Sequence, residues 1–93
     1  MEFTLTEKAK IKLNEMKNNN KPIKLKITSY SWSGATFGIV SEKQTENEKV
    51  YNIDDIDIIV SEDLNGILKG AEINYSTSFF TKGFDVTPII SRI

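Results

Sequence analysis

The chain has 93 residues, 12 basic and 13 acidic side chains, a formal net charge of −1, and neither cysteine nor histidine. This length fits one domain, residues 1–93, with a single modest core. The missing residue types exclude disulfides, thiol nucleophiles and thiolate metal centres. The near-neutral charge, with Arg92 as the only arginine, disfavours nucleic acid as a partner.

The beginning of the chain does not resemble a secretory signal, because polar and acidic residues interrupt it at Glu2, Thr4, Thr6 and Glu7. No apolar run approaches the roughly 18 residues of a membrane span. We therefore expect a cytoplasmic protein that does not bind membranes.

The first element predicted is a helix of about three turns. A short extended segment at residues 3–5 precedes it, and Thr6 is placed to cap it. The asparagines at 18–20, followed by Pro22, should end it. Its buried face is predicted from apolar residues at helical spacing, namely Ala9, Leu13 and Met16.

Short strands follow the helix. Residues 23–28 alternate between apolar and polar side chains, which predicts a strand with one dry face and one wet face that carries Lys24 and Lys26. The next elements expected are a loop at 29–34, a strand at 35–41, a solvated connection at 42–49, and a hairpin of strands 50–53 and 56–60 around a tight turn at Asp54-Asp55.

The last third should begin with a short second helix. Ser61 would cap it, Leu64, Ile67 and Leu68 would form its apolar face, and Gly70 would end it by accepting a positive φ. We then expect a strand at 73–77, a loop at 78–83, a short strand at 84–86 before Pro88, and an apolar tail at 89–93 that is tied down.

These elements predict an α+β fold that is mostly β. Several short strands with one N-terminal helix and one short second helix favour a small antiparallel or mixed β-sandwich, or pseudobarrel, with helices at its edge.

A series of short blocks lies in a particular order along the chain. The blocks are Phe3-Thr4-Leu5-Thr6, strand 23–28 with Trp32-Ser33-Gly34 after it, Ile56–Val60, Leu68-Lys69-Gly70, Glu72–Tyr75 and Gly83–Thr87. In this order and spacing they resemble the HesB-like, or A-type, iron–sulfur cluster carrier family over essentially the whole chain. The resemblance implies a β-sandwich-like domain with a flanking helix, and carriers that hold iron or a [2Fe–2S] cluster and pass it to other proteins.

The resemblance also implies where the cluster ligands would lie. The family has one cysteine in a Cys-Ser-Gly loop after the first long strand and two in a Cys-Gly-Cys tail. Here the loop reads Trp32-Ser33-Gly34, and the sequence ends at Ile93 without the tail motif. Neither the indole of Trp32 nor the hydroxyls of Ser31 and Ser33 replaces thiolate. We therefore predict no cofactor and no metal-ligating residues.

Aromatic residues mark a candidate contact surface for a partner or ligand. Tryptophan and tyrosine dominate the hot spots of protein interfaces, and adjacent residues in extended chain point in opposite directions. The alternative interpretation is that the indole packs over the end of the sandwich and the phenylalanines lie in the core. The candidate contact residues are Tyr30, Trp32, Ser33, Phe79 and Phe80.

No catalytic residue is predicted. A nucleophilic serine needs a base, and histidine is absent. The sequence also has no glycine-rich phosphate loop. The acidic residues Asp54, Asp55, Asp57, Glu62 and Asp63 lack the pattern of a calcium loop, and a hairpin turn followed by a helix cap explains them.

Three functional hypotheses follow. The first is a non-catalytic HesB-like protein without cluster ligands, a protein-binding or regulatory module that contacts iron–sulfur assembly proteins or another cytosolic protein as a monomer or weak homodimer. The alternative is a small apolar-ligand-binding protein with a dry pocket beside Trp32. The third is a metal site built from oxygen ligands, which needs three or more converging carboxylates.

Overall fold

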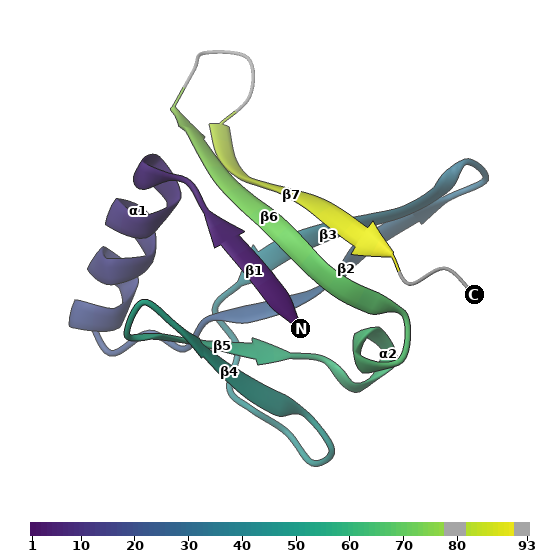
Figure 1. Ribbon diagram of the computed structural model, residues 1–93, viewed down its shortest axis with the longest axis horizontal. Helices are drawn as coiled ribbons and strands as arrows, with labels where there is room; N and C mark the ends of the chain where they lie inside the picture. The colour runs from purple at the N-terminus through teal and green to yellow at the C-terminus, as the bar shows by residue number, and fades with distance from the viewer. Residues whose placement is uncertain (78–81, 91–93) are drawn as a thin grey trace.

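Within residues 1–77 and 82–90, which the computed structural model describes, seven strands form two sheets that pack face to face (Figure 1). The smaller sheet has the order β1-β6-β7, with β1 (Glu2–Leu5), β6 (Leu68–Thr77) and β7 (Lys82–Ile90). The larger sheet has the order β3-β2-β5-β4, with β2 (Lys24–Ser31), β3 (Gly34–Val40), β4 (Lys49–Ile53) and β5 (Ile56–Val60).

The two packed sheets confirm the predicted mostly-β sandwich, and each sheet is mixed. β1 runs parallel to β6 and β2 runs parallel to β5, whereas the other neighbouring strands are antiparallel. β3 lies beside β7 on one side of the sandwich. On the other side, the rings of Phe3 in β1 and Tyr51 in β4 lie 5.9 Å apart. The extended segment predicted before the helix is thus a paired strand.

The helix α1 (Glu7–Asn18) forms as predicted and packs against β6 and β5. The Ala9 amide donates to Thr6 Oγ1 over 3.3 Å, which caps its first turn. Ala9 and Leu13 are fully buried. Asn20 takes a φ of 57° after the helix, a conformation that asparagine tolerates. No helix in the described ranges is long and apolar enough to cross a bilayer.

The core lies between the sheets and under α1. Inward-facing residues of β2, β5 and β6 supply most of it, because alternate side chains of a strand share one face. Leu64 of the short helix α2 (Glu62–Asn65) is also fully buried. The largest side chains without exposed surface are Leu13, Leu25, Ile56, Ile58, Val60, Leu64 and Ile73.

The predicted hairpin turn between β4 and β5 is confirmed. Asp54 and Asp55 have φ angles of 51° and 66°, as the two central residues of a type I′ turn require. Two lysines of α1 hold this turn. Lys10 Nζ lies 3.4 Å from Asp54 Oδ2, and Lys17 Nζ donates to the Asp55 carbonyl over 2.6 Å. Lysines from the first and the last turn of α1 therefore hold the turn of the hairpin against the helix.

The prediction for the second helix was wrong at its C-terminal end. α2 stops at Asn65, and Leu68 already belongs to β6. Gly70 does not end a helix but lies opposite Glu2 in the β1–β6 pair, where a Cβ would collide with the Glu2 carbonyl oxygen. Glycine is needed there because two backbones approach closely.

The predicted short strand at 84–86 was also too short. β7 continues through Pro88 to Ile90, and Pro88 lies opposite Ala71 of β6. Proline is tolerated because β7 is the outer strand of its sheet, where one backbone edge makes no ladder bonds. The apolar tail is thus held by pairing up to Ile90, and residues 91–93 lie outside the described ranges.

The connection between β3 and β4 crosses the outer face of the larger sheet, because these two strands lie at opposite edges. We call residues 41–48 the strap. Lys24 Nζ lies 2.8 Å from Glu48 Oε1, and their side chains are only 6% and 8% exposed. Lys26 Nζ lies 3.0 Å from Glu42 Oε2. The expectation that Lys24 lies on a wet face was wrong, because the strap covers it.

The buried ion pair shifts the ionisation of Glu48. The hydrogen bond from Lys24 lowers the pKa of the Glu48 carboxyl, and the hydrogen bond from the Thr45 amide, 2.7 Å from Glu48 Oε1, lowers it further. Burial opposes both effects. A carboxyl with a lowered folded-state pKa stabilises the fold above its unfolded-state pKa, and this stability is lost as pH falls through the lowered value.

We predict that Glu48→Gln lowers the free energy of unfolding at neutral pH by about 3 kcal/mol, because it leaves the Lys24 ammonium buried without its counter-charge. Urea unfolding at a series of pH values should also show a weaker loss of stability in acid than in the unchanged protein. Glu42→Gln is the control, since its partner Lys26 is 38% exposed and the expected cost is below about 0.5 kcal/mol. Equal costs for the two variants would contradict the prediction.

Gly70→Ala should destabilise the fold by about 2 kcal/mol, because the added methyl group forces β1 away from β6. Gly66→Ala provides the matched control. Gly66 has a φ of −92° and nothing within 4 Å of an added Cβ, so this change should be neutral or slightly stabilising. Thermal and urea denaturation would measure both, and a neutral Gly70→Ala would refute the close approach.

Candidate functional site

A hairpin of the larger sheet extends beyond the sandwich (Figure 1). It is made of the distal halves of β2 and β3, which pair antiparallel around a two-residue turn at Trp32 and Ser33. Gly34 follows the turn with a φ of 136°, a conformation that favours glycine. We call the segment from Thr28 to Thr36 the arm. Every residue in it is exposed.

A β-bulge marks the base of the arm. Thr28 is the extra residue on β2, since Ile27 pairs with Phe37 while Ser29 pairs with Thr36. Below the bulge, Ile27 and Phe37 pack against the core. Above it, the strands leave the sandwich, as the local bend and added twist of a bulge allow. The bulge therefore separates the part of the hairpin that stabilises the fold from the part that projects.

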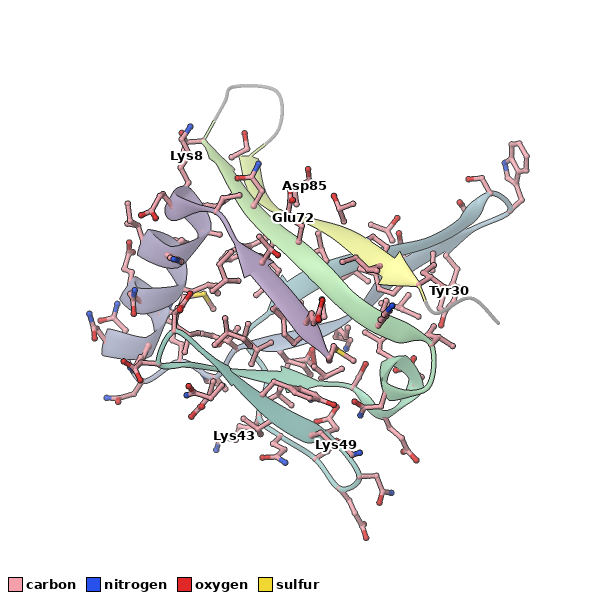
Figure 2. All side chains as sticks on the ribbon, viewed as in Figure 1. Lys8, Tyr30, Lys43, Lys49, Glu72 and Asp85 are labelled. Carbon is pink, nitrogen blue, oxygen red and sulfur yellow. The ribbon has the colours of Figure 1, made fainter. Side chains whose placement is uncertain are left out.

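The tip of the arm carries the aromatic residues singled out in the sequence. Trp32 is 100% exposed and Tyr30 is 76% exposed. The Oγ atoms of Ser31 and Ser33 lie 2.9 Å apart, and Ser31 Oγ donates to the Gly34 carbonyl over 3.2 Å. These bonds hold the turn that presents the indole. In Figure 2, Tyr30 lies at the outer side of the molecule, away from the core.

The structure brings Tyr30, Trp32 and Ser33 together on one arm, whereas Phe79 and Phe80 lie outside the described residues. Tyr30 lies on β2 and not in the loop expected at 29–34. The alternative in which the indole packs over the sandwich was wrong, because Trp32 is fully exposed and no described residue covers it. For the same reason the described residues form no dry pocket beside it.

Sequence reasoning missed two further surfaces. Ile89 and Ile90 are paired in β7 but remain 45% and 55% exposed. β7 ends on the same side of the molecule as the arm (Figure 1). The second surface is a hollow rimmed by Lys17, Lys21 and Lys43, which come from separate segments. The sequence marks Ile89 and Ile90 as apolar but not as exposed, and the hollow has no local signal because it depends on how distant segments meet.

The arm offers little to acid–base or nucleophilic chemistry. The Ser33 hydroxyl contacts another hydroxyl and no base. Glu48, whose carboxyl pKa is lowered, lies in the strap and is paired with Lys24.

Carboxylates are the candidate metal donors of this chain. The sequence contains no cysteine or histidine, and the described ranges contain no group of three or more acidic residues placed to hold a metal ion. Asp54 and Asp55 form a turn, and Asp57 Oδ1 accepts a hydrogen bond from Asn52 Nδ2 over 2.8 Å. Cysteine thiolates are the usual ligands of iron–sulfur clusters.

The family model for iron–sulphur cluster biosynthesis matches residues 1–90. The chain belongs to this family. The resemblance seen in the order of the sequence blocks is thereby confirmed.

Solved structures share the fold. The chain is similar to the crystal structure of SufA from Escherichia coli, a protein involved in the biosynthesis of iron–sulfur clusters, with a TM-score of 0.69, 18% identity, and coverage of 91% of this chain and 78% of SufA. It is also similar to the solution structure of a protein from Aquifex aeolicus, with a TM-score of 0.64, 20% identity, and coverage of 91% and 89%. No curated protein matches the sequence.

Trp32 is the single tryptophan and is fully exposed, so the fluorescence emission of the folded protein should be that of an indole in water. We predict that the emission maximum of the folded protein equals that of the unfolded chain. Trp32→Ala should change the free energy of unfolding by less than about 0.5 kcal/mol. Phe37→Ala, below the bulge, should cost about 2 kcal/mol or more, as measured by circular dichroism in urea. Blue-shifted emission together with a destabilised Trp32→Ala would contradict an exposed indole.

Proposed function

We propose that this family member is a non-catalytic, protein-binding module of iron–sulfur cluster biosynthesis that does not carry a cluster itself. The observation that supports it best is the fully exposed Trp32 at the tip of the arm, at the position where the resemblance implies a cysteine. In this proposal the arm keeps the contact surface of the family fold and exchanges a metal ligand for an aromatic anchor.

The physical argument rests on the surface that the indole offers. An exposed tryptophan on a projecting arm can be buried by a partner without rearranging the core, and burying it removes roughly 150–250 Å² of surface from water. Tyr30 on the same arm adds a second aromatic ring with a polar tip. Tryptophan and tyrosine are enriched among residues whose truncation costs about 2 kcal/mol or more of binding free energy.

The same observations support a non-catalytic role. The serines of the arm are paired with each other, and the chain has no histidine or cysteine to activate a nucleophile. Without a cluster shared between subunits, we expect a monomer or weak homodimer. The partner would be an iron–sulfur assembly protein or another cytosolic protein.

Anaerobic reconstitution with iron and sulfide tests the cluster-free part of the proposal. After desalting, the protein should be colourless and hold no more iron than the urea-unfolded chain treated in the same way, because thiolate donors are lacking. SufA from Escherichia coli, treated in parallel, serves as the family reference. A stable brown protein would refute this part.

Binding by the arm is tested with purified proteins of iron–sulfur cluster assembly, titrated against this chain. Trp32→Ala should weaken binding by about tenfold or more, since loss of a central aromatic anchor costs at least about 1.4 kcal/mol. Ile11→Ala is the control, because Ile11 is 67% exposed but lies on α1, away from the arm. Equal weakening by both variants, or none by Trp32→Ala, would contradict the proposed contact.

A further inference from the structure

A second surface lies on the outer face of the larger sheet. A hollow of about 500 Å³ opens between the strap and the connection that joins α1 to β2. We call it the lysine groove. Its lining includes the charged residues Lys17, Lys21, Lys43 and Asp57 and the apolar residues Val50 and Ile59.

Three lysines from three segments line the groove. Lys17 comes from the last turn of α1, Lys21 from the connection after it, and Lys43 from the strap. The side chains of Lys21 and Lys43 make no hydrogen bond or ion pair with any described residue, whereas the backbone amide of Lys21 donates to the Met16 carbonyl. Lys17 donates one hydrogen bond to the Asp55 carbonyl, which leaves two of its three donors.

One carboxylate, that of Asp57, faces these cations, and its Oδ1 already accepts a hydrogen bond from Asn52. The charge of the groove is therefore positive. Figure 2 shows Lys43 on the β4 side of the molecule and the acidic Glu72 and Asp85 on β6 and β7, in the other sheet. The excess of lysine over carboxylate in the groove lining favours an anion there.

The wall of the groove is partly apolar and fixed. Ile59 and Val50 are opposite each other in the β4–β5 ladder, and Val50 is 43% exposed. The strap that forms one side is anchored to β2 by the buried Lys24–Glu48 pair. The volume lies in the range of small-molecule sites, which combine apolar walls with a few polar groups.

We propose that the lysine groove binds a small organic anion, with a carboxylate or phosphate among Lys17, Lys21 and Lys43 and an apolar body against Val50 and Ile59. Lysine is a compact point charge that suits a single anionic group, whereas extended nucleic acid is better recognised by arginine. The groove is built from different residues than the arm, so this inference does not depend on the proposed function.

The test is a titration of the isotope-labelled full chain, followed by amide NMR spectra. Hexanoate and hexyl phosphate are the probes, hexanamide is the neutral control, and acetate and inorganic phosphate supply the head groups alone. Hexanoate or hexyl phosphate should cause saturable shifts of amides lining the groove, with dissociation constants in the millimolar range, and the tighter of the two identifies the head group. Hexanamide should bind at least about tenfold more weakly, because it lacks charge-assisted hydrogen bonds.

Charge reversal locates the site. Lys21→Glu with Lys43→Glu should weaken binding of the hexyl anion by about tenfold or more and create binding of hexylammonium. Lys8→Glu with Lys69→Glu changes the net charge equally at exposed lysines outside the groove and should leave the affinity within about twofold. Lys21→Gln with Lys43→Gln is the second variant if charge reversal disturbs the fold, and it should also lose the anion.

Several outcomes would overturn the inference. Equal affinity for hexanamide would show that charge plays no part, and shifts spread over all exposed lysines would show unspecific attraction. Equal loss of binding in the Lys21→Glu/Lys43→Glu variant and in the Lys8→Glu/Lys69→Glu control would also show unspecific attraction. A short acidic peptide that shifts the groove amides when neither hexyl anion does would assign the groove to a protein segment instead. Trp32→Ala should leave hexanoate binding unchanged, which separates this test from that of the arm.

Discussion

The parallel pairing of β2 with β5 at the centre of the larger sheet determines much of the rest of the molecule. It places β3 and β4 at opposite edges, so the chain between them must cross the outer face of the sheet. A crossing segment that covers a strand also covers its side chains. Lys24 therefore becomes buried on a face that its sequence pattern marks as wet, and it requires Glu48 as a counter-charge.

The same topology divides the surface into two separate regions. One edge of the larger sheet carries the β2–β3 hairpin, whose distal half has no sheet to pack on and projects as the arm. The outer face carries the strap, and the space left beside the strap is the lysine groove. An aromatic tip suits contact with another macromolecule, whereas a hollow rimmed with cations suits a small anion.

The chain combines membership in the iron–sulphur cluster biosynthesis family with a sequence that contains no cysteine. The fold resembles that of SufA at 18% identity, so the two chains share an architecture with largely different side chains. A fold supports different functions when the residues at one site change. At the tip of the arm this chain presents a fully exposed aromatic side chain, Trp32.

Local chemistry alone decided several features, and the sequence therefore predicted them. The cap at Thr6, the apolar spacing of α1 and the turn at Asp54-Asp55 each depend on neighbouring residues, and the order of the blocks was enough to indicate the family. Tertiary structure decided the rest: the burial of Lys24, the close approach that requires Gly70, and the meeting of three lysines from separate segments. The physical reason is that periodicity and capping act within a few residues, whereas burial depends on which distant segment covers a side chain.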